Sequence, residues 1–219
     1  PFLKSMYQTI LKKFSEDGIH LNDEQENFLR IFEKNLPRKS VFADFFKKKL
    51  KKGCYVHGDV GRGKTMILNA IFKEIKLTKC SYHFIEFMKF IHSELELVKN
   101  TKDPLEKIAK RIASKYRVLF IDEFQVEDVA DAMIVGKLLK HLIEFNLTLY
   151  LTSNAHPSDL YKNGLQRKQF IDDMNIISQS FNVFELNGEI DYRARNIVNT
   201  EAVGSKKLYT DDEIKEIID

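Results

Sequence analysis

The sequence has little cysteine and no long apolar run. Its two cysteines, Cys54 and Cys80, cannot provide the four ligands of a structural zinc site, and no cluster of histidines accompanies them. Both stand in apolar stretches, which predicts buried thiols in a reducing compartment. No segment approaches the roughly 18 apolar residues that a membrane-spanning helix needs. No signal peptide is visible, and because the chain begins with Pro1 instead of Met, this expectation covers only the residues present.

An excess of charge of one sign is also absent. The 35 basic and 32 acidic side chains leave a net charge of +3, which gives no strong attraction to nucleic acid or to an anionic membrane. The densest basic run, residues 47–52, is interpreted as a solvated helix end. Hydrophobic residues make up 43% and charged residues 31% of the 219 residues, which is typical of a globular chain with a core. This length suffices for one large α/β domain or two small ones.

Helical and strand patterns alternate along most of the chain. Apolar residues at helical spacing predict helices, and short apolar segments rich in β-formers predict strands. The expected helices cover residues 1–14, 23–36, 41–50, 64–75, 86–98, 103–114, 128–145, 165–181 and 211–218, and the expected strands cover residues 54–56, 82–85, 117–121, 147–152 and 183–186. The alternation favours an α/β fold with a parallel sheet covered by helices on both faces.

A glycine-rich loop follows the first expected strand. Lys64 is expected to reach the β- and γ-phosphates of a nucleotide, and the Thr65 hydroxyl to join the shell of a Mg²⁺ ion. Glycines let backbone N–H groups turn toward phosphate oxygens, and the helix that follows adds the positive end of its dipole. The sequence therefore predicts ATP and Mg²⁺ as cofactors. The pattern G-x-x-x-x-G-K-[ST] and the residue after it give the expected nucleotide-binding residues: Gly58, Asp59, Val60, Gly61, Arg62, Gly63, Lys64, Thr65 and Met66.

Two acidic residues follow the third expected strand. Asp122 and Glu123 come directly after four apolar residues. Asp122 is predicted to hold Mg²⁺ through water, and Glu123 to orient and deprotonate the attacking water. A parallel sheet brings the carboxyl ends of its strands to one edge, so the pair should lie beside the glycine-rich loop. A water-activating glutamate also argues against a small-molecule kinase, whose acceptor brings its own hydroxyl group.

The fourth expected strand ends in polar residues. If this strand lies between the strand of the phosphate loop and the strand of Asp122, Asn154 is placed to help position the attacking water. The alternative is an ordinary exit from a strand into a turn, because Asn favours turns. The presence of the other two motifs favours the first interpretation.

Several longer segments resemble one family, the ZapE-type ATPases, whose mitochondrial members are called AFG1-like or lactation-elevated ATPases. The segments are HGDVGRGKT (57–65), FIDEFQVEDVADAMI (120–134), LTSNAHPSDLYKNGLQR (151–167) and DYR (191–193). HFIEFM (83–88) is similar to a further family stretch, although Glu86 stands where the family usually has a basic residue. The resemblance covers residues 53–195, and several of its motifs are long and unusual.

The resemblance implies an AAA+ P-loop fold with the strand order 5-1-4-3-2. It also implies a homo-oligomeric ring, expected to be a hexamer, with the ATP sites between subunits. The carried-over roles agree with those given above for the phosphate loop, Asp122 and Glu123, and they add Asn154 as a sensor. Arg167 is implied to be an arginine finger that acts on the neighbouring subunit's ATP. Its alternative is a surface arginine paired with Asp172 or Asp173, and Arg193 and Arg195 are rival fingers.

The resemblance further implies ATP-driven remodelling of a protein partner. In bacteria the expected partner is a division-ring protein, met in the cytoplasm with peripheral association at the inner membrane. In mitochondria it is a set of respiratory-chain subunits. The alternative is a nucleic-acid-linked AAA+ loader of the helicase-loader type. Nucleic acid is the less favoured partner, because no basic stripe with interleaved aromatics is visible outside residues 47–52.

The family pattern also predicts how the chain is divided. We expect an N-terminal helical segment over residues 1–52, the ATPase core over residues 53–195 and a short tail over residues 196–219. The family continues after its DYR motif into a C-terminal helical lid. Only a short tail follows Arg195 here, so the lid is expected to be missing or truncated.

Phe87 and Met88 follow the second expected strand, where AAA+ translocases carry an aromatic pore residue. We therefore predict that they lie on a loop that faces the ring's central pore. The alternative is an ordinary core position, because both residues belong to an apolar set with helical spacing.

Overall fold

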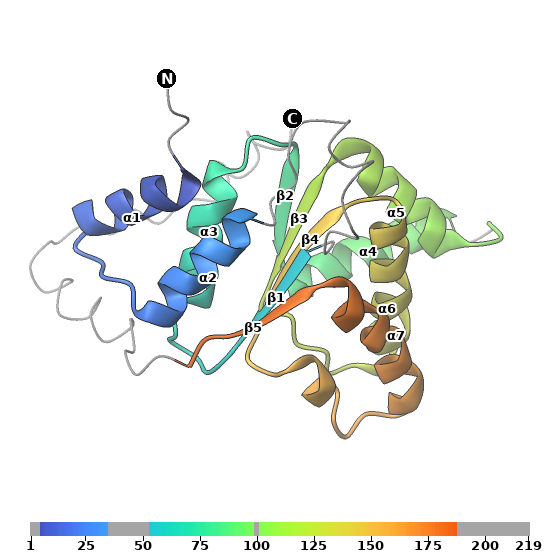
Figure 1. Cartoon of the computed structure of the whole chain (residues 1–219). Coiled ribbons are helices and arrows are strands. Elements are labelled where there is room, and N and C mark those ends of the chain that lie inside the picture. Colours follow the sequence, from blue (N-terminus) through green and yellow to red (C-terminus); the bar gives the residue numbers. More distant parts are fainter. Residues whose placement is uncertain (1–4, 35–52, 99–100, 188–219) are drawn as a thin grey trace, which may run out of the picture.

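A five-stranded parallel sheet separates two layers of helices (Figure 1). The structure is a computed structural model, and it describes residues 5–34, 53–98 and 101–187. The strand order is β2-β3-β4-β1-β5, and every neighbouring pair is parallel. Counted from the β5 edge, this is the predicted strand order 5-1-4-3-2, which is therefore confirmed. The strands are β1 (Gly53–His57), β2 (Lys79–His83), β3 (Val118–Asp122), β4 (Thr148–Ser153) and β5 (Asn182–Glu185).

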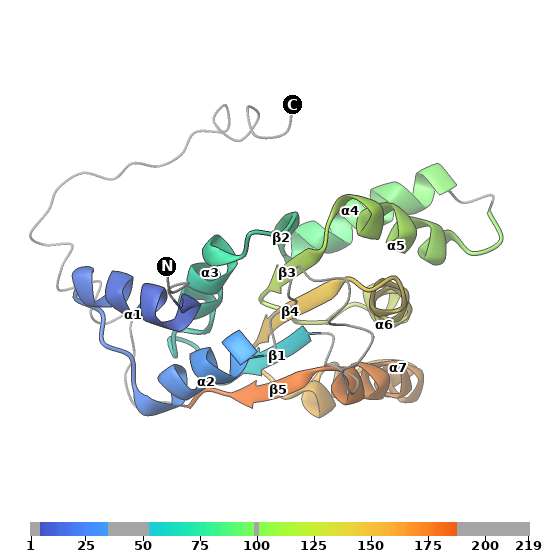
Figure 2. The ribbon, with the colours of Figure 1, turned by 45° about the horizontal axis from the view of Figure 1, so that its top comes forward.

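Within the described part of the chain, three helices cover one face of the sheet and four cover the other (Figure 2). The first layer consists of α1 (Met6–Glu16), α2 (Asp23–Lys34) and α3 (Lys64–Glu74). The second layer consists of α4 (Phe84–Val98), α5 (Pro104–Lys115), α6 (Val129–Glu144) and α7 (Arg167–Ser180). A short 3₁₀ helix, η1 (Pro157–Asp159), lies between β4 and α7.

The central strands are apolar on both faces because each face has its own helical layer. Val118 and Phe120 of β3 belong to the core cluster beneath α1, α2 and α3. Leu119 and Ile121, which alternate with them along β3, belong to the core cluster beneath α4, α5, α6 and α7. Successive side chains of a strand point to opposite faces, so a strand buried on both sides reads as a continuous apolar run. The predicted architecture is therefore confirmed.

The second strand was predicted to begin at residue 82, three residues after its actual start at Lys79. The structure places β2 at Lys79–His83, and Phe84 already begins α4. β2 is an edge strand whose residues are only half-buried or exposed, so its own apolar signal is weak. The apolar run that suggested a strand belongs in part to the first turn of α4.

The pore prediction for Phe87 and Met88 is wrong. Both residues lie in α4, where their exposed fractions are 0% and 2%, and both pack in the core between α4 and the sheet. Tyr82 of β2 contacts the Phe87 ring, with centroids 5.9 Å apart. The helical spacing of this apolar set reflects burial, as the alternative interpretation held.

The two cysteines differ in burial. Cys54 is buried, as predicted, and this burial raises the pKa of its thiol. Cys80 is only half-buried, because β2 is an edge strand, although burial still raises its pKa to about 12. Both thiols are free.

Some predictions lie outside the described residues. They are the helices at 41–50 and 211–218, the basic run at 47–52, the DYR motif, the rival fingers Arg193 and Arg195, and the tail with its expected loss of a lid. Among residues 5–34, 53–98 and 101–187, no helix is long and apolar enough to span a membrane.

Candidate nucleotide site

The glycine-rich loop lies at the carboxyl edge of the sheet, between β1 and α3. Gly58 has φ +142°, and a Cβ at this position would lie 2.1 Å from the Leu186 carbonyl oxygen. The chain therefore needs glycine here both for its conformation and for the close approach of the segment after β5. Gly61 and Gly63 also have positive φ angles, of 84° and 80°, and Gly63 is the N-cap of α3. The loop thus curls around the first turn of α3, as the phosphate-binding pattern predicts.

A cavity of about 270 Å³ opens above this loop. It brings together the loop, Glu123 and the end of β4, which are far apart in the sequence. Its lining includes Glu123 after β3 and Asn154 after β4, together with most of the residues that the sequence assigned to the nucleotide. Gly58, Asp59 and Asp122 do not line it, although Asp122 bonds to Thr65, which does. The lining residues from the loop are Val60, Gly61, Arg62, Gly63, Lys64, Thr65 and Met66.

Lys64 is held at the centre of the loop. Its side chain is buried, and its Nζ donates to the carbonyl oxygens of Gly58 at 2.6 Å and Asp59 at 2.7 Å. The same Nζ donates to Asn154 Oδ1 at 3.1 Å. The ammonium group therefore lies where the loop, α3 and the end of β4 converge. The contact with Asn154 joins two residues that the sequence predicted independently for one site.

Asp122 and Thr65 form the centre of a hydrogen-bonded group of oxygens. The Thr65 hydroxyl donates to Asp122 Oδ1 at 2.9 Å. The Thr152 hydroxyl donates to the same carboxylate oxygen and accepts from the Glu123 N–H at 2.9 Å. A hydroxyl and a carboxylate at this spacing are hard oxygen donors of the kind that Mg²⁺ uses alongside water and phosphate oxygens. The residues present therefore fit the predicted magnesium ion.

Glu123 has an unusual backbone conformation. Its φ angle is +54°, in the left-handed region that non-glycine residues rarely adopt, and its side chain is exposed. The bond from its N–H to Thr152 and the bond from Phe124 N to the Thr152 carbonyl oxygen, at 2.7 Å, hold the turn in place. Such conformations persist where surrounding contacts enforce them, and they concentrate at functional sites.

Two residues near the acidic pair were not identified from the sequence. Thr152 is 1% exposed and contacts both Asp122 and Glu123. His83 Nδ1 lies 3.9 Å from Asp122 Oδ2, because β2 and β3 pair His83 with Asp122. The only sequence signal for Thr152 was a polar residue at the end of an apolar strand, and the register of β3 and β4 was needed to interpret it.

A histidine pair lies beside the loop on its β5 side. The His57 and His156 rings are perpendicular, with centroids 5.0 Å apart. Burial lowers the pKa of His57, and the proximity of His156 and Lys64 lowers it further, against the opposing effect of Glu185 and Asp159. His57 is therefore favoured as a neutral ring that adds no charge to the loop.

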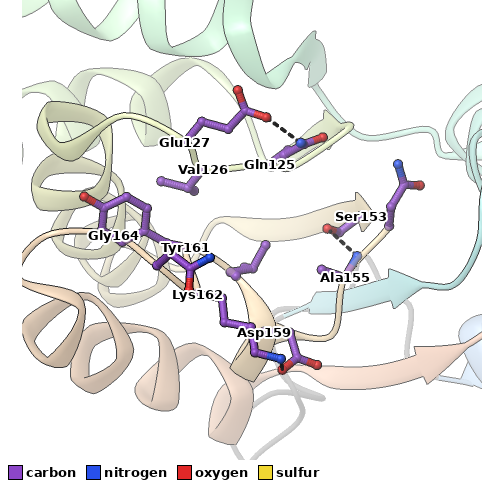
Figure 3. Close-up of a pocket in the computed structure, with 12 residues that line it drawn as sticks. Gln125, Val126, Glu127, Ser153, Ala155, Asp159, Tyr161, Lys162 and Gly164 are labelled. Carbon is purple, nitrogen blue, oxygen red and sulfur yellow. Dashed lines mark hydrogen bonds and ion pairs between the residues drawn. The ribbon is translucent and has the colours of Figure 1, made fainter.

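A larger cavity, of about 490 Å³, adjoins the first across Ser153 and Asn154 (Figure 3). It lies between the loop after β3 and the segment from β4 to α7. Gln125 Nε2 donates to Glu127 Oε1 at 2.6 Å on one wall, and Ala155 N donates to Ser153 Oγ at 3.2 Å on the other. The Tyr161 ring covers Gly164, where any Cβ would clash with it.

Arg167 is the first residue of α7 and lines neither cavity. Its Nη2 donates to the Ser158 carbonyl oxygen at 2.6 Å. Its Nε is buried and has no hydrogen-bond partner within the described part of the chain. No ion pair joins Arg167 to Asp172 or Asp173 among those same residues, so the guanidinium group is held by a turn of its own segment instead.

Comparison with known proteins identifies related chains. A model of the AFG1-like ATPase family matches residues 14–217. Cell division protein ZapE of Escherichia coli K12 is 40% identical over 147 residues, which cover 67% of this chain and 39% of that protein. Lactation elevated protein 1 homolog B of Danio rerio is 33% identical over 158 residues, which cover 67% of this chain and 31% of that protein. The matched part of the chain thus spans between three and four tenths of the length of these two relatives.

Solved structures with the same fold include proteins of DNA replication. A crystal structure of DnaI has a TM-score of 0.56 and 25% identity, and it covers 81% of this chain and 89% of that chain. AMPPCP-bound DnaA from Aquifex aeolicus has a TM-score of 0.52 and 14% identity, covering 87% of this chain and 56% of that chain. The likeness to DnaA shows the P-loop fold and nothing about function.

Proposed function

The chain belongs to the AFG1-like ATPase family, and we propose that it binds ATP with Mg²⁺ in the cavity above the phosphate loop and hydrolyses it to ADP and phosphate. One observation carries this proposal. Lys64, Thr65, Glu123 and Asn154 come from three separate parts of the sequence and line one cavity of about 270 Å³, and Asp122 contacts this group through the Thr65 hydroxyl. Each has the chemistry that one part of phosphoryl transfer to water requires.

Lys64 is the residue that binds the phosphates. Its Nζ now donates to two loop carbonyls and to Asn154, and phosphate oxygens are stronger acceptors for an ammonium group than carbonyl oxygens. We expect the β- and γ-phosphates to take over these bonds. Backbone N–H groups of the loop and the N-terminus of α3 add to the attraction.

Glu123 and Asn154 act on the attacking water. Asn154 orients it, and the Glu123 carboxylate accepts its proton as the water oxygen bonds to the γ-phosphorus. The bond between the γ-phosphorus and the β–γ bridging oxygen breaks, and ADP leaves with that oxygen. Thr65, and Asp122 through water, would hold Mg²⁺, which would supply positive charge beside the β- and γ-phosphates. The left-handed backbone at Glu123 turns its side chain out of the strand and into the cavity lining.

Arg167 serves the neighbouring subunit in a ring of identical chains. It begins α7, it does not line its own chain's nucleotide cavity, and its Nε has no partner among the described residues. A planar guanidinium group is suited to bind the charge that develops on the γ-phosphate. The ring, expected to be hexameric, would couple hydrolysis to the remodelling of a protein partner.

The name of the Escherichia coli relative supports a partner in cell division, which would place the protein in the bacterial cytoplasm at the inner face of the membrane. The Danio rerio relative leaves a mitochondrial setting as the alternative. A nucleic-acid-linked loader remains the second candidate, because a helicase loader of Bacillus subtilis is 26% identical over 112 residues. Strong, salt-dependent binding to single-stranded DNA would favour that candidate.

Phosphate release tests the enzymatic proposal. The purified chain should release phosphate from ATP in the presence of Mg²⁺, and the Glu123→Gln variant should not, while still binding ATP. The Glu127→Gln variant provides a control, since Glu127 lies on the same loop but lines the other cavity. Wild-type-like phosphate release by Glu123→Gln would overturn the assignment of the base. The same Glu123→Gln protein, which holds ATP, can then be used to isolate the bound protein partner.

A further inference from the structure

One fully buried polar side chain near the nucleotide site comes from the N-terminal helices. Gln25 of α2 is 1% exposed. The other buried polar residues of the described chain are His57, Lys64, Asp122, Thr152 and Ser153, which lie at the ends of strands or on the phosphate loop itself. Burial of an amide is costly unless its donor and acceptor groups are both used. The contacts of Gln25 therefore indicate its role.

The acceptor of the Gln25 amide is used inside α2. Its Oε1 accepts from Asn22 N at 3.0 Å, and Asn22 Oδ1 accepts from Gln25 N at 2.9 Å. This reciprocal pair is a capping box, which begins the helix and satisfies two backbone donors. A capping box needs only the oxygen of the amide. A glutamate would serve equally well at this position if capping were the whole role.

The donor of the amide reaches the phosphate loop. Gln25 Nε2 donates to the Arg62 carbonyl oxygen at 2.9 Å, across 37 residues of sequence. Arg62 lies between Gly61 and Gly63, which both have positive φ angles and the conformational freedom of glycine. The bond therefore holds the peptide that joins Arg62 to Gly63, in a part of the loop where a glycine stands on either side of Arg62.

The contact between Gln25 and Arg62 also determines the direction of the Gly63 N–H. In a planar trans peptide, the carbonyl oxygen of Arg62 and the N–H of Gly63 point in opposite directions. Because Gln25 binds the Arg62 oxygen, the Gly63 N–H points away from α2. Gly63 lines the nucleotide cavity and is the N-cap of α3, where N–H groups bind anions.

The two N-terminal helices make further contacts with each other and with the rest of the chain. The Glu33 carboxylate accepts from Ser5 Oγ and from Met6 N, at 2.6 Å, so it caps the N-terminus of α1. Lys13 of α1 pairs with Glu74 of α3 at 2.5 Å. Glu24 Oε2, in the first turn of α2, accepts from Asn187 N at 3.1 Å. The two N-terminal helices are thus fastened to the helix that follows the loop and to the segment after β5.

We propose that Gln25 is a positioning residue for ATP binding: it fixes the phosphate loop from outside the loop by holding the Arg62 peptide. This inference rests on the proposed nucleotide site and adds the N-terminal helices to it. It also predicts that α2, which precedes β1, is part of the functional ATPase unit, because Gln25 of α2 helps to hold the phosphate loop.

Two substitutions separate the two roles of the amide. Gln25→Glu, studied at pH 8, retains an oxygen that accepts from Asn22 N but cannot donate to the Arg62 carbonyl. Gln25→Met removes both contacts and keeps the length of the side chain. Glu33→Ala is the matched control, because it weakens the same pair of helices at the cap of α1 without reaching the loop. Titration with Mg-ADP measures affinity, thermal unfolding measures stability, and hydrogen exchange of residues 58–65 without nucleotide measures the order of the loop.

Both Gln25 variants should bind Mg-ADP about three- to tenfold more weakly than wild type, the size expected for one lost hydrogen bond. Both should exchange the loop amides faster, whereas Glu33→Ala should lower the unfolding temperature and leave affinity and loop exchange unchanged. Wild-type affinity and loop exchange in both Gln25 variants would overturn this inference and leave the nucleotide site intact. Equal losses in Glu33→Ala would also overturn it, because they would reflect stability alone. Failure of the wild type to bind nucleotide would instead remove the proposed function itself.

Discussion

The two cavities at the carboxyl edge of the sheet share Ser153 and Asn154 but differ in how their side chains are held. In the smaller one, Lys64 donates to two loop carbonyl oxygens and to Asn154, and the adjacent Asp122 carboxylate accepts from two hydroxyl groups. Arg167, which follows Gly164 of the larger cavity's lining by three residues, is held by a bond to a backbone carbonyl, and its Nε has no hydrogen-bond partner among the described residues. This difference is consistent with our proposal that one chain supplies the side chains of the nucleotide site, whereas Arg167 acts on a neighbouring subunit.

Glu123→Gln should produce the largest loss of turnover, because it removes the proposed general base from the smaller, nucleotide-binding cavity. We expect a decrease of about 10³- to 10⁴-fold in phosphate release, toward the upper part of the range for general bases. ATP affinity should stay near that of wild type, since the amide keeps the shape of the side chain. Steady-state phosphate release and calorimetry check the two halves of this prediction.

Arg167→Ala should lower turnover by about 10³-fold with nearly unchanged ATP affinity, as expected for an arginine that acts on a neighbour. Adding an excess of subunits that keep Arg167 but carry Glu123→Gln should partly restore turnover, because mixed rings pair an intact base with an intact arginine. Lys168→Ala, a change of the exposed neighbouring cation, is the control. Normal turnover in Arg167→Ala alone would move the assignment to Arg193.

Thr152→Val should have an intermediate effect, because it leaves Asp122 and the Glu123 N–H without the Thr152 hydroxyl. We expect a loss of about 1–3 kcal/mol in the free energy of unfolding, which is the usual cost of unsatisfied buried groups. Mg-ATP affinity should fall as well, since the Asp122 carboxylate loses a contact that orients it. Thr148→Val, at the other end of β4, is the matched control, and chemical denaturation with Mg-ATP titration measures both effects.

His57→Asn should give the smallest effect, and one that depends on pH. Burial lowers the pKa of His57 in the folded chain, so the unfolded chain binds a proton more readily below about pH 6.5. The stabilising contribution of the neutral ring is therefore present above that pH and is lost as the pH falls. The variant should show a shallower loss of thermal stability between about pH 7 and pH 5 than wild type. His20→Asn, an exposed histidine, serves as control, and an unchanged slope in His57→Asn would contradict the assignment.

Much of the fold and site could be predicted because the signals are contiguous in sequence. The phosphate loop occupies one run of residues, Asp122 is the last residue of the buried strand β3, and Glu123 and Asn154 directly follow β3 and β4. In a parallel sheet such positions meet at one edge, so their proximity required no knowledge of side-chain packing. The contact between Lys64 and Asn154 is the direct result.

The remaining features depend on contacts that no local pattern encodes. Gln25 appears in the sequence as part of an ordinary helix start, and its bond to Arg62 depends on how α2 packs beside the loop. Thr152 becomes informative only once β3 and β4 are in register. Phe87 and Met88 failed as pore residues because helical apolar spacing is equally typical of a buried face, and burial is a property of the whole fold.

Calorimetric titration of Mg-ATP into Lys64→Ala and Lys73→Ala tests the central claim most directly. Both variants remove one lysine from α3, but only Lys64 is buried in the phosphate loop, whereas Lys73 is exposed. The account predicts wild-type binding by Lys73→Ala and no measurable binding by Lys64→Ala, because the latter loses the cation that contacts the β- and γ-phosphates. Equal ATP affinity in the two variants would contradict the assignment of the nucleotide site.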